Sequence, residues 1–150
     1  MKALLRLLVR LCFRFSAYNP EVLSTPGPVL LVPNHVSWLD WLFLAVTLDD
    51  DWKFVTSSTT AQSHWILHKV MVNRRTFPVD NSSPYAVRDM AEHLKAGGRL
   101  VLFAEGRITL SGSLMKVYDG TGFLIRQTNA KVITCYLRGA SRVRFVRHGG

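Results

Sequence analysis

The chain carries a histidine and an aspartate inside one of its most apolar segments. In VLLVPNHVSWLDWLFL, residues 29–44, His35 and Asp40 stand among aliphatic and aromatic residues. Five positions put them about 140° apart on an ideal helix, so they can meet only if His35 folds back from a preceding loop. Asp40 would then fix the imidazole tautomer and leave the other nitrogen as a general base for a hydroxyl. The alternative is that both polar groups are satisfied by local capping alone.

A second polar group follows the buried segment 99–104. The tripeptide Glu105–Gly106–Arg107 offers a carboxylate, a flexible glycine and a guanidinium. Arginine suits a phosphate because its planar fork binds two oxygens, and glycine lets backbone N–H groups approach an anion. Further donors follow at Thr109, Ser111, Ser113 and Lys116. The pattern predicts a phosphate site, with a solvated turn and a surface salt bridge as the alternative.

These residues lie in a pattern of alternating strands and helices. Apolar runs predict strands at 29–33, 53–57, 75–80, 99–106 and 131–140. Helices are predicted at 37–48, 60–72, 82–98 and 119–130, with Ser37 capping the first and a serine capping the third. The fold class predicted is α/β, with a mixed, mainly parallel sheet flanked by helices.

Polar clusters follow three of the predicted strands, at 33–40, 77–83 and 103–113. In open α/β sheets the ligand site lies beyond the carboxyl ends of the strands. The three clusters therefore predict one composite site.

Length and composition limit the class of protein. The 150 residues fit one domain, and 48% are hydrophobic while the net charge is +9. A basic, apolar chain favours an anionic membrane surface, and no Lys/Arg run exceeds two residues, so we expect no nucleic-acid partner. Cys12 and Cys135 show no zinc or disulfide pattern, which fits a reducing compartment.

Residues 1–18 predict an amphipathic helix at a membrane interface. Lys2, Arg6, Arg10 and Arg14 are four apart and form one slowly turning stripe, while the remaining surface is aliphatic. Such a helix can lie on an anionic leaflet, or alternatively pack on the domain. No apolar run reaches about 18 residues, so no membrane-spanning helix is expected.

Two smaller features have simpler interpretations. His64 and His68 are four apart and could chelate a metal from one helical face, but no acidic third ligand lies nearby. The acidic run 49–51 is expected to be a solvated loop. The sequence therefore predicts no metal site.

Four blocks of the chain, taken in order, resemble the PlsC-like glycerolipid acyltransferases. NHVSWLD is similar to the N-H-x-x-x-x-D signature of that family, TFPVD to its second block, FAEGRIT to its F-P-E-G block and KVITCYLRG to its closing strand. The similarity runs from about residue 28, so residues 28–150 are expected to form an acyltransferase domain with a glycerol-3-phosphate acyltransferase-like fold. The form of residues 105–123 is most similar to the acyltransferase domain of bifunctional acyl-ACP synthetase/2-acylglycerophosphoethanolamine acyltransferases.

The resemblance implies transfer of a fatty acyl chain from acyl-ACP or acyl-CoA to the free hydroxyl of a lysophospholipid. The acceptor would be of the 2-acylglycerophosphoethanolamine or 1-acylglycerol-3-phosphate type, in phospholipid synthesis or remodelling. His35 would be the general base and Asp40 its orienting partner. Substrate binding is expected at Asn34, Phe77, Asp80, Glu105, Gly106, Arg107, Thr109 and Lys116.

The resemblance also implies a setting for the enzyme. The expected protein is peripheral, on the cytoplasmic face of the inner membrane, and its partners are membrane lipid and acyl-carrier protein. No cofactor is expected besides the acyl thioester. The chain ends soon after the closing block, as expected of a C-terminally truncated chain or a small stand-alone relative.

The chain departs from the family pattern at three places. Ala104 and Thr134 stand where proline is usual, and no arginine follows Asp80. Two other functions stay open at this point: a thioester or ester hydrolase in which His35 activates water, and a non-catalytic membrane lipid-binding module.

Overall fold

The computed structural model describes residues 2–58, 75–80, 83, 85–109 and 111–140. The helix predicted at 60–72, with His64 and His68, lies outside these residues. The strands are β1 Val29–Pro33, β2 Trp52–Ser57, β3 Thr76–Val79, β4 Arg99–Val101 and β5 Lys131–Cys135. The helices are α1 Lys2–Phe13, α2 Asp40–Thr47, α5 Ala86–Lys95 and α6 Asp119–Thr128, with a 3-10 turn η1 at Pro20–Ser24.

The five strands form one sheet in the order β3-β2-β4-β1-β5. All four described strand pairs are parallel, so the antiparallel strand allowed by the sequence is not found among them. Residue 29 of β1 pairs with residue 99 of β4 and residue 131 of β5. Strand β1 is therefore an interior strand, paired on both sides, which explains its unbroken apolar sequence.

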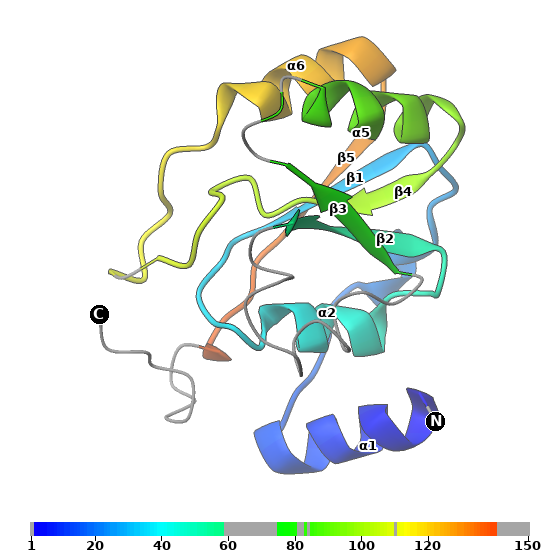
Figure 1. The fold of residues 1–150 in the computed structure, drawn as a ribbon. Coiled ribbons are helices and arrows are strands. Elements are labelled where there is room, and N and C mark those ends of the chain that lie inside the picture. Colours follow the sequence, from blue (N-terminus) through cyan, green and yellow to red (C-terminus); the bar gives the residue numbers. More distant parts are fainter. Residues whose placement is uncertain (1, 59–74, 81–82, 84, 110, 141–150) are drawn as a thin grey trace.

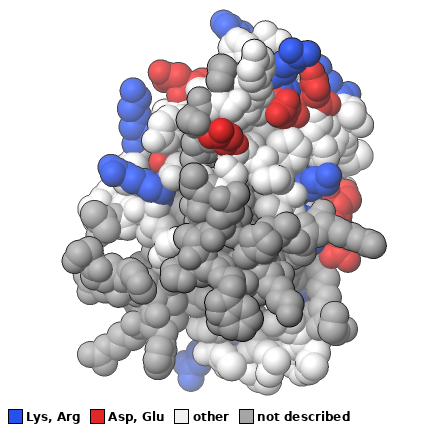
Figure 2. Space-filling view, in the orientation of Figure 1, with Lys and Arg blue, Asp and Glu red and all other residues white. Residues whose placement is uncertain are grey.

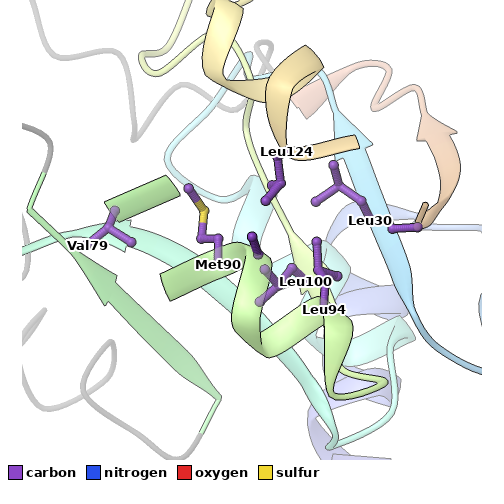
Figure 3. Close-up of a cluster of buried hydrophobic side chains, with 8 residues drawn as sticks. Leu30, Val79, Met90, Leu94, Leu100 and Leu124 are labelled. Atoms are coloured by element: carbon purple, nitrogen blue, oxygen red, sulfur yellow. The ribbon is translucent and has the colours of Figure 1, made fainter. Parts of the chain in front are cut away.

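Helices cover both faces of the sheet (Figure 1): α5 and α6 lie on one face, α2 lies on the other, and α1 packs outside α2. Alternate residues of β1 and β4 supply the two cores. Leu30 and Leu100 pack with α5 and α6 residues such as Met90, Leu94 and Leu124 (Figure 3). Strand residues Val29, Leu31 and Val101 pack on the opposite side with Leu44 and Leu48 of α2.

Two predicted helix starts were wrong by a few residues. Helix α2 begins at Asp40, because the Ser37 hydroxyl accepts the Leu39 N–H at 3.2 Å and residues 37–39 form a turn. Similarly, α5 begins at Ala86, and the Ser83 hydroxyl accepts the Tyr85 N–H. In both segments a serine side chain bonds to the backbone two residues later and delays the helix.

Helix α1 is present but ends at Phe13, earlier than the predicted residue 18. It ends there because the next residue, Arg14, takes a left-handed backbone conformation (φ 48°). The helix docks on α2 through buried Val9 and through the Arg6 Nε–H, which donates to the Val46 carbonyl at 2.7 Å. Its other side exposes five leucines: Leu4, Leu5, Leu7, Leu8 and Leu11. The helix therefore packs on the domain and also presents an apolar surface.

Candidate active site

His35 and Asp40 meet at the carboxyl end of strand β1. His35 lies in the loop after β1, and its Nδ1 is 2.8 Å from Oδ2 of Asp40, the first residue of α2. The Asp40 side chain is fully buried, and the same Oδ2 accepts the N–H groups of Val36 and Ser37 at 2.7 and 2.8 Å. This carboxylate holds the proton on Nδ1, so Nε2 is the nitrogen left to accept a proton. The geometric prediction for the pair is confirmed.

The loop after β4 clamps the backbone of His35. The buried Glu105 carboxylate accepts the His35 N–H at 3.0 Å through Oε1 and the Met115 N–H at 2.8 Å through Oε2. From the other side the Thr109 N–H donates to the His35 carbonyl at 2.8 Å. Glu105 was expected to help to hold a phosphate, but the structure gives both of its oxygens to backbone donors. In the structure Glu105 therefore holds the backbone of His35 in place.

The same loop opens into a small hollow. A cavity of about 250 Å³ is lined by Glu105, Arg107, Met115, Lys116, Tyr118 and Asp119. Gly106 has a φ of +68°, and a Cβ there would lie 2.5 Å from the Tyr118 ring, so glycine is required by conformation and by space. The exposed Arg107 and Lys116 therefore share a hollow next to the segment that holds His35.

Two predicted substrate-binding side chains make bonds within the protein. The Asn34 amide donates to the Leu137 carbonyl at 3.1 Å and accepts the Leu137 N–H at 2.6 Å, which joins the ends of β1 and β5. The Thr109 hydroxyl donates to the Ser113 carbonyl at 2.8 Å. In the structure both side chains stabilise loops of the site. The single hydrogen of the Thr109 hydroxyl is used in its bond, whereas the Asn34 amide donates one of its two N–H hydrogens within the protein.

The second block does not join the pair. Phe77 packs into the core under α5, with its ring 5.4 Å from that of His93, whereas the His35 ring stacks at 4.2 Å on Phe103. Phe103 belongs to the core on the opposite, α2 face of the sheet. Asp80 is exposed just after the edge strand β3, which β2 and β4 separate from β1. The structure therefore does not bring Phe77 or Asp80 to His35.

Sequence reasoning missed two aromatic residues of the site. Phe103 stacks on the imidazole, and Tyr118 covers Gly106 while its N–H donates to the Ala104 carbonyl at 3.0 Å. The position of Phe103, two residues before Glu105, was a usable signal. Tyr118 had none, because a long loop returns it to the end of β4.

Cys135 is the thiol of β5 that stands opposite Pro33 of β1. Burial, and to a lesser extent the charge of Asp40, raises the pKa of this thiol. The thiol therefore stays protonated at neutral pH, and none of the described Ser, Thr or Cys side chains hydrogen-bonds to the imidazole of His35. The described residues thus provide a base without an activated nucleophile.

The described ranges contain neither a metal-ligand cluster nor a membrane-spanning helix. Among those residues, no group of three or more His, Cys, Asp or Glu side chains is placed to hold a metal ion. Within the part of the chain that the structure describes, no helix has the length and apolar character needed to cross a membrane.

Residues 14–138 match the sequence profile of the Acyltransferase family, and the chain therefore belongs to that family. The fold is similar to the crystal structure of the 1-acyl-sn-glycerophosphate (LPA) acyltransferase PlsC from Thermotoga maritima, with a TM-score of 0.67 and 18% sequence identity. That match covers 97% of this chain and 62% of the Thermotoga chain, so this chain spans less than two thirds of its length. The predicted fold class is confirmed, and the family match agrees with the resemblance of the four sequence blocks.

Proposed function

We propose that the chain transfers a fatty acyl group from an acyl thioester to the free hydroxyl of a lysophospholipid. The observation that carries the proposal is the His35–Asp40 pair at 2.8 Å, held against a loop that presents Arg107. A base and a phosphate-binding cation on adjoining segments are the groups that a phosphate-bearing alcohol needs.

The reaction proceeds by direct attack. His35 Nε2 takes the proton of the lysolipid hydroxyl as its oxygen attacks the thioester carbonyl. The carbon–sulfur bond then breaks, the new ester forms, and the proton passes to the leaving sulfur to give the thiol. The protonated Cys135 thiol and the lack of a described nucleophile on the imidazole support this route over an acyl-enzyme.

The acceptor and donor follow from charge and from the resemblance of residues 105–123. Arg107 and Lys116 would bind the acceptor phosphate, of the 2-acylglycerophosphoethanolamine or 1-acylglycerol-3-phosphate type. The net charge of +9 favours an acidic carrier such as acyl-ACP, with acyl-CoA as the other donor.

The enzyme would work at an anionic membrane surface. The exposed leucines of α1 lie beside Arg10, and the first 18 residues contain no Asp or Glu. An apolar stripe flanked by cations suits an interfacial helix on an anionic leaflet, such as the cytoplasmic face of an inner membrane.

The test is acyl transfer from labelled acyl-ACP and acyl-CoA to a panel of lysophospholipids, with wild type beside His35→Ala. We expect product with wild type and a loss of about 100-fold or more with the variant, because general-base catalysis contributes at least that factor.

The no-acceptor reaction separates the other functions. Thioester consumption that does not depend on the lysophospholipid would make the protein a hydrolase. Lipid binding without turnover, unchanged in His35→Ala, would make it a binding module and end the proposal.

A further inference from the structure

The hollow at Arg107 continues into a second, larger one. A shallow hollow of about 460 Å³ is lined by Val117, Tyr118, Asp119, Gly122, Phe123 and Arg126. Tyr118 and Asp119 line both hollows. A ligand bound at Arg107 would therefore have Tyr118 and Asp119 as its next neighbours.

The first hollow contains cations suited to a phosphate. Arg107 and Lys116 are exposed. Of the two acids that line this hollow, Glu105 and Asp119, the first already accepts two backbone N–H groups. A phosphate there would lie on the loop that fixes His35, which suits an acceptor whose hydroxyl must reach Nε2.

The boundary with the second hollow has the opposite character. Asp119 is exposed, and its carboxylate makes no hydrogen bond or ion pair with the described residues. Two aromatic side chains line the same hollow: Tyr118 is 66% exposed and Phe123 is 46% exposed. A carboxylate beside exposed rings is a combination that binds an ammonium group.

Charges of both signs occur near α5 and α6. On the face drawn in Figure 2, Lys and Arg side chains lie among Asp and Glu side chains over the upper part, where α5 and α6 lie. Within the hollows, the cations and Asp119 are likewise neighbours, and Arg126 lies with Phe123 in the larger one. A ligand that carries both a negative and a positive group fits this lining better than a phosphate monoester alone.

From this we infer that Tyr118 and Asp119 form an amine subsite that selects acceptors whose phosphate carries a cationic head group. The phosphate lies on Arg107 and Lys116, and the ammonium lies between the Asp119 carboxylate and the Tyr118 ring. The inference rests on the proposed function, since it chooses between the two acceptor types named there.

The experiment compares kcat/KM for lysophosphatidylethanolamine, its N-acetylated form, lysophosphatidylglycerol and lysophosphatidate. Wild type should prefer the free amine by about tenfold, and Asp119→Asn should remove that preference while leaving the other acceptors within about twofold. Tyr118→Phe should keep the preference and Tyr118→Leu should reduce it. Asp89→Asn is the matched control, since Asp89 is an exposed acid in the first turn of α5, outside both hollows.

Equal rates with the free and acetylated amines, or an equal loss on all acceptors in Asp119→Asn, would overturn the inference and leave the proposed function standing. If no acceptor is acylated, the proposed function fails instead. Nuclear magnetic resonance titration with glycerophosphoethanolamine and glycerophosphoglycerol then decides the inference without turnover. If glycerophosphoethanolamine binds more tightly than glycerophosphoglycerol, and Asp119→Asn removes the difference, the amine subsite is supported. Equal binding of the two compounds refutes the subsite.

Discussion

One oxygen of Asp40 performs two tasks at once. Oδ2 accepts the imidazole Nδ1 and the N–H groups of Val36 and Ser37, whereas Oδ1 is buried without a partner among the described residues. The bonds to Val36 and Ser37 fold the loop, and the bond to His35 orients the base. The local fold of the loop and the orientation of the His35 ring therefore depend on the same atom.

Asp40→Asn tests that dependence. The amide carries no charge to stabilise the imidazolium, so we expect kcat to fall about 100-fold. The free energy of unfolding should fall by about 2 kcal/mol, because an amide oxygen in the place of Oδ2 leaves the NH2 group buried without an acceptor at the place of Oδ1. Initial rates and urea unfolding measure the two effects.

Ser37→Ala is the matched control, because it removes the bond to the Leu39 N–H and leaves the carboxylate intact. Near-wild-type kcat is expected for this variant. If Ser37→Ala loses as much activity as Asp40→Asn, the loop fold matters and the charge of Asp40 does not.

Whether two site residues could be predicted to contact each other depends on how far apart they are in the sequence. His35 and Asp40 are five positions apart, so local geometry sufficed to bring them together. Glu105 contacts His35 across 70 positions, a separation that equals the β1–β4 register and is fixed only by the sheet. The side on which Phe77 points likewise depends on how β3 sits on β2, which the sequence does not specify.

At the scale of elements, α5 packs on the sheet with a titratable ring in the contact. His93 of α5 lies against Phe77 of β3, and its Nε2 is buried with no hydrogen-bond partner among the described residues. Desolvation, and then the charge of Lys53, lowers the pKa of His93 from its ordinary 6.5. Packing of α5 therefore favours the neutral imidazole.

This lowered pKa predicts a stability that falls with acidification. As the pH drops below about 6.5, the unfolded chain binds a proton at this histidine before the folded chain does, so the folded state loses stability until its own lower pKa is reached. The free energy of unfolding, measured by urea between about pH 7 and about pH 5, should fall more steeply for wild type than for His93→Gln. Parallel curves would show that His93 does not contribute.

Element type was predictable in β1, from its unbroken apolar run, and in α6, and the observed bounds of both are close to the predicted ones. Helix starts were not, because the serine-to-backbone bonds at Ser37 and Ser83 compete with the first helical turn. Strand β4 is also shorter than its apolar run, ending at Val101 where the chain turns to reach His35.

The whole molecule is layered, with the site and the apolar helix connected through α2. Phe43, one turn after Asp40, contacts the rings of Phe13 and Phe15 at 5.4 and 5.3 Å. Helix α1 is thus the outermost layer and also touches the helix that begins with Asp40. In the strand order, β4 lies between β2 and β1. This order could not be predicted from the sequence, because the strands that pair with β4 are not consecutive with it in the chain.

This layering predicts that membrane binding depends on the outer side of α1. Leu4 and Leu11 are 62% and 71% exposed, and each buried leucine contributes roughly 1.5–3 kcal/mol of transfer free energy. The double variant Leu4→Glu/Leu11→Glu should bind anionic vesicles more weakly by at least about tenfold in sedimentation, and wild-type binding should weaken with salt. Leu114→Glu/Tyr136→Glu changes two equally exposed apolar residues away from α1 and should bind as wild type does. An equal loss in both double variants would mean that the membrane contact is not made by α1, since its apolar side would then be no more important than any other exposed apolar residue.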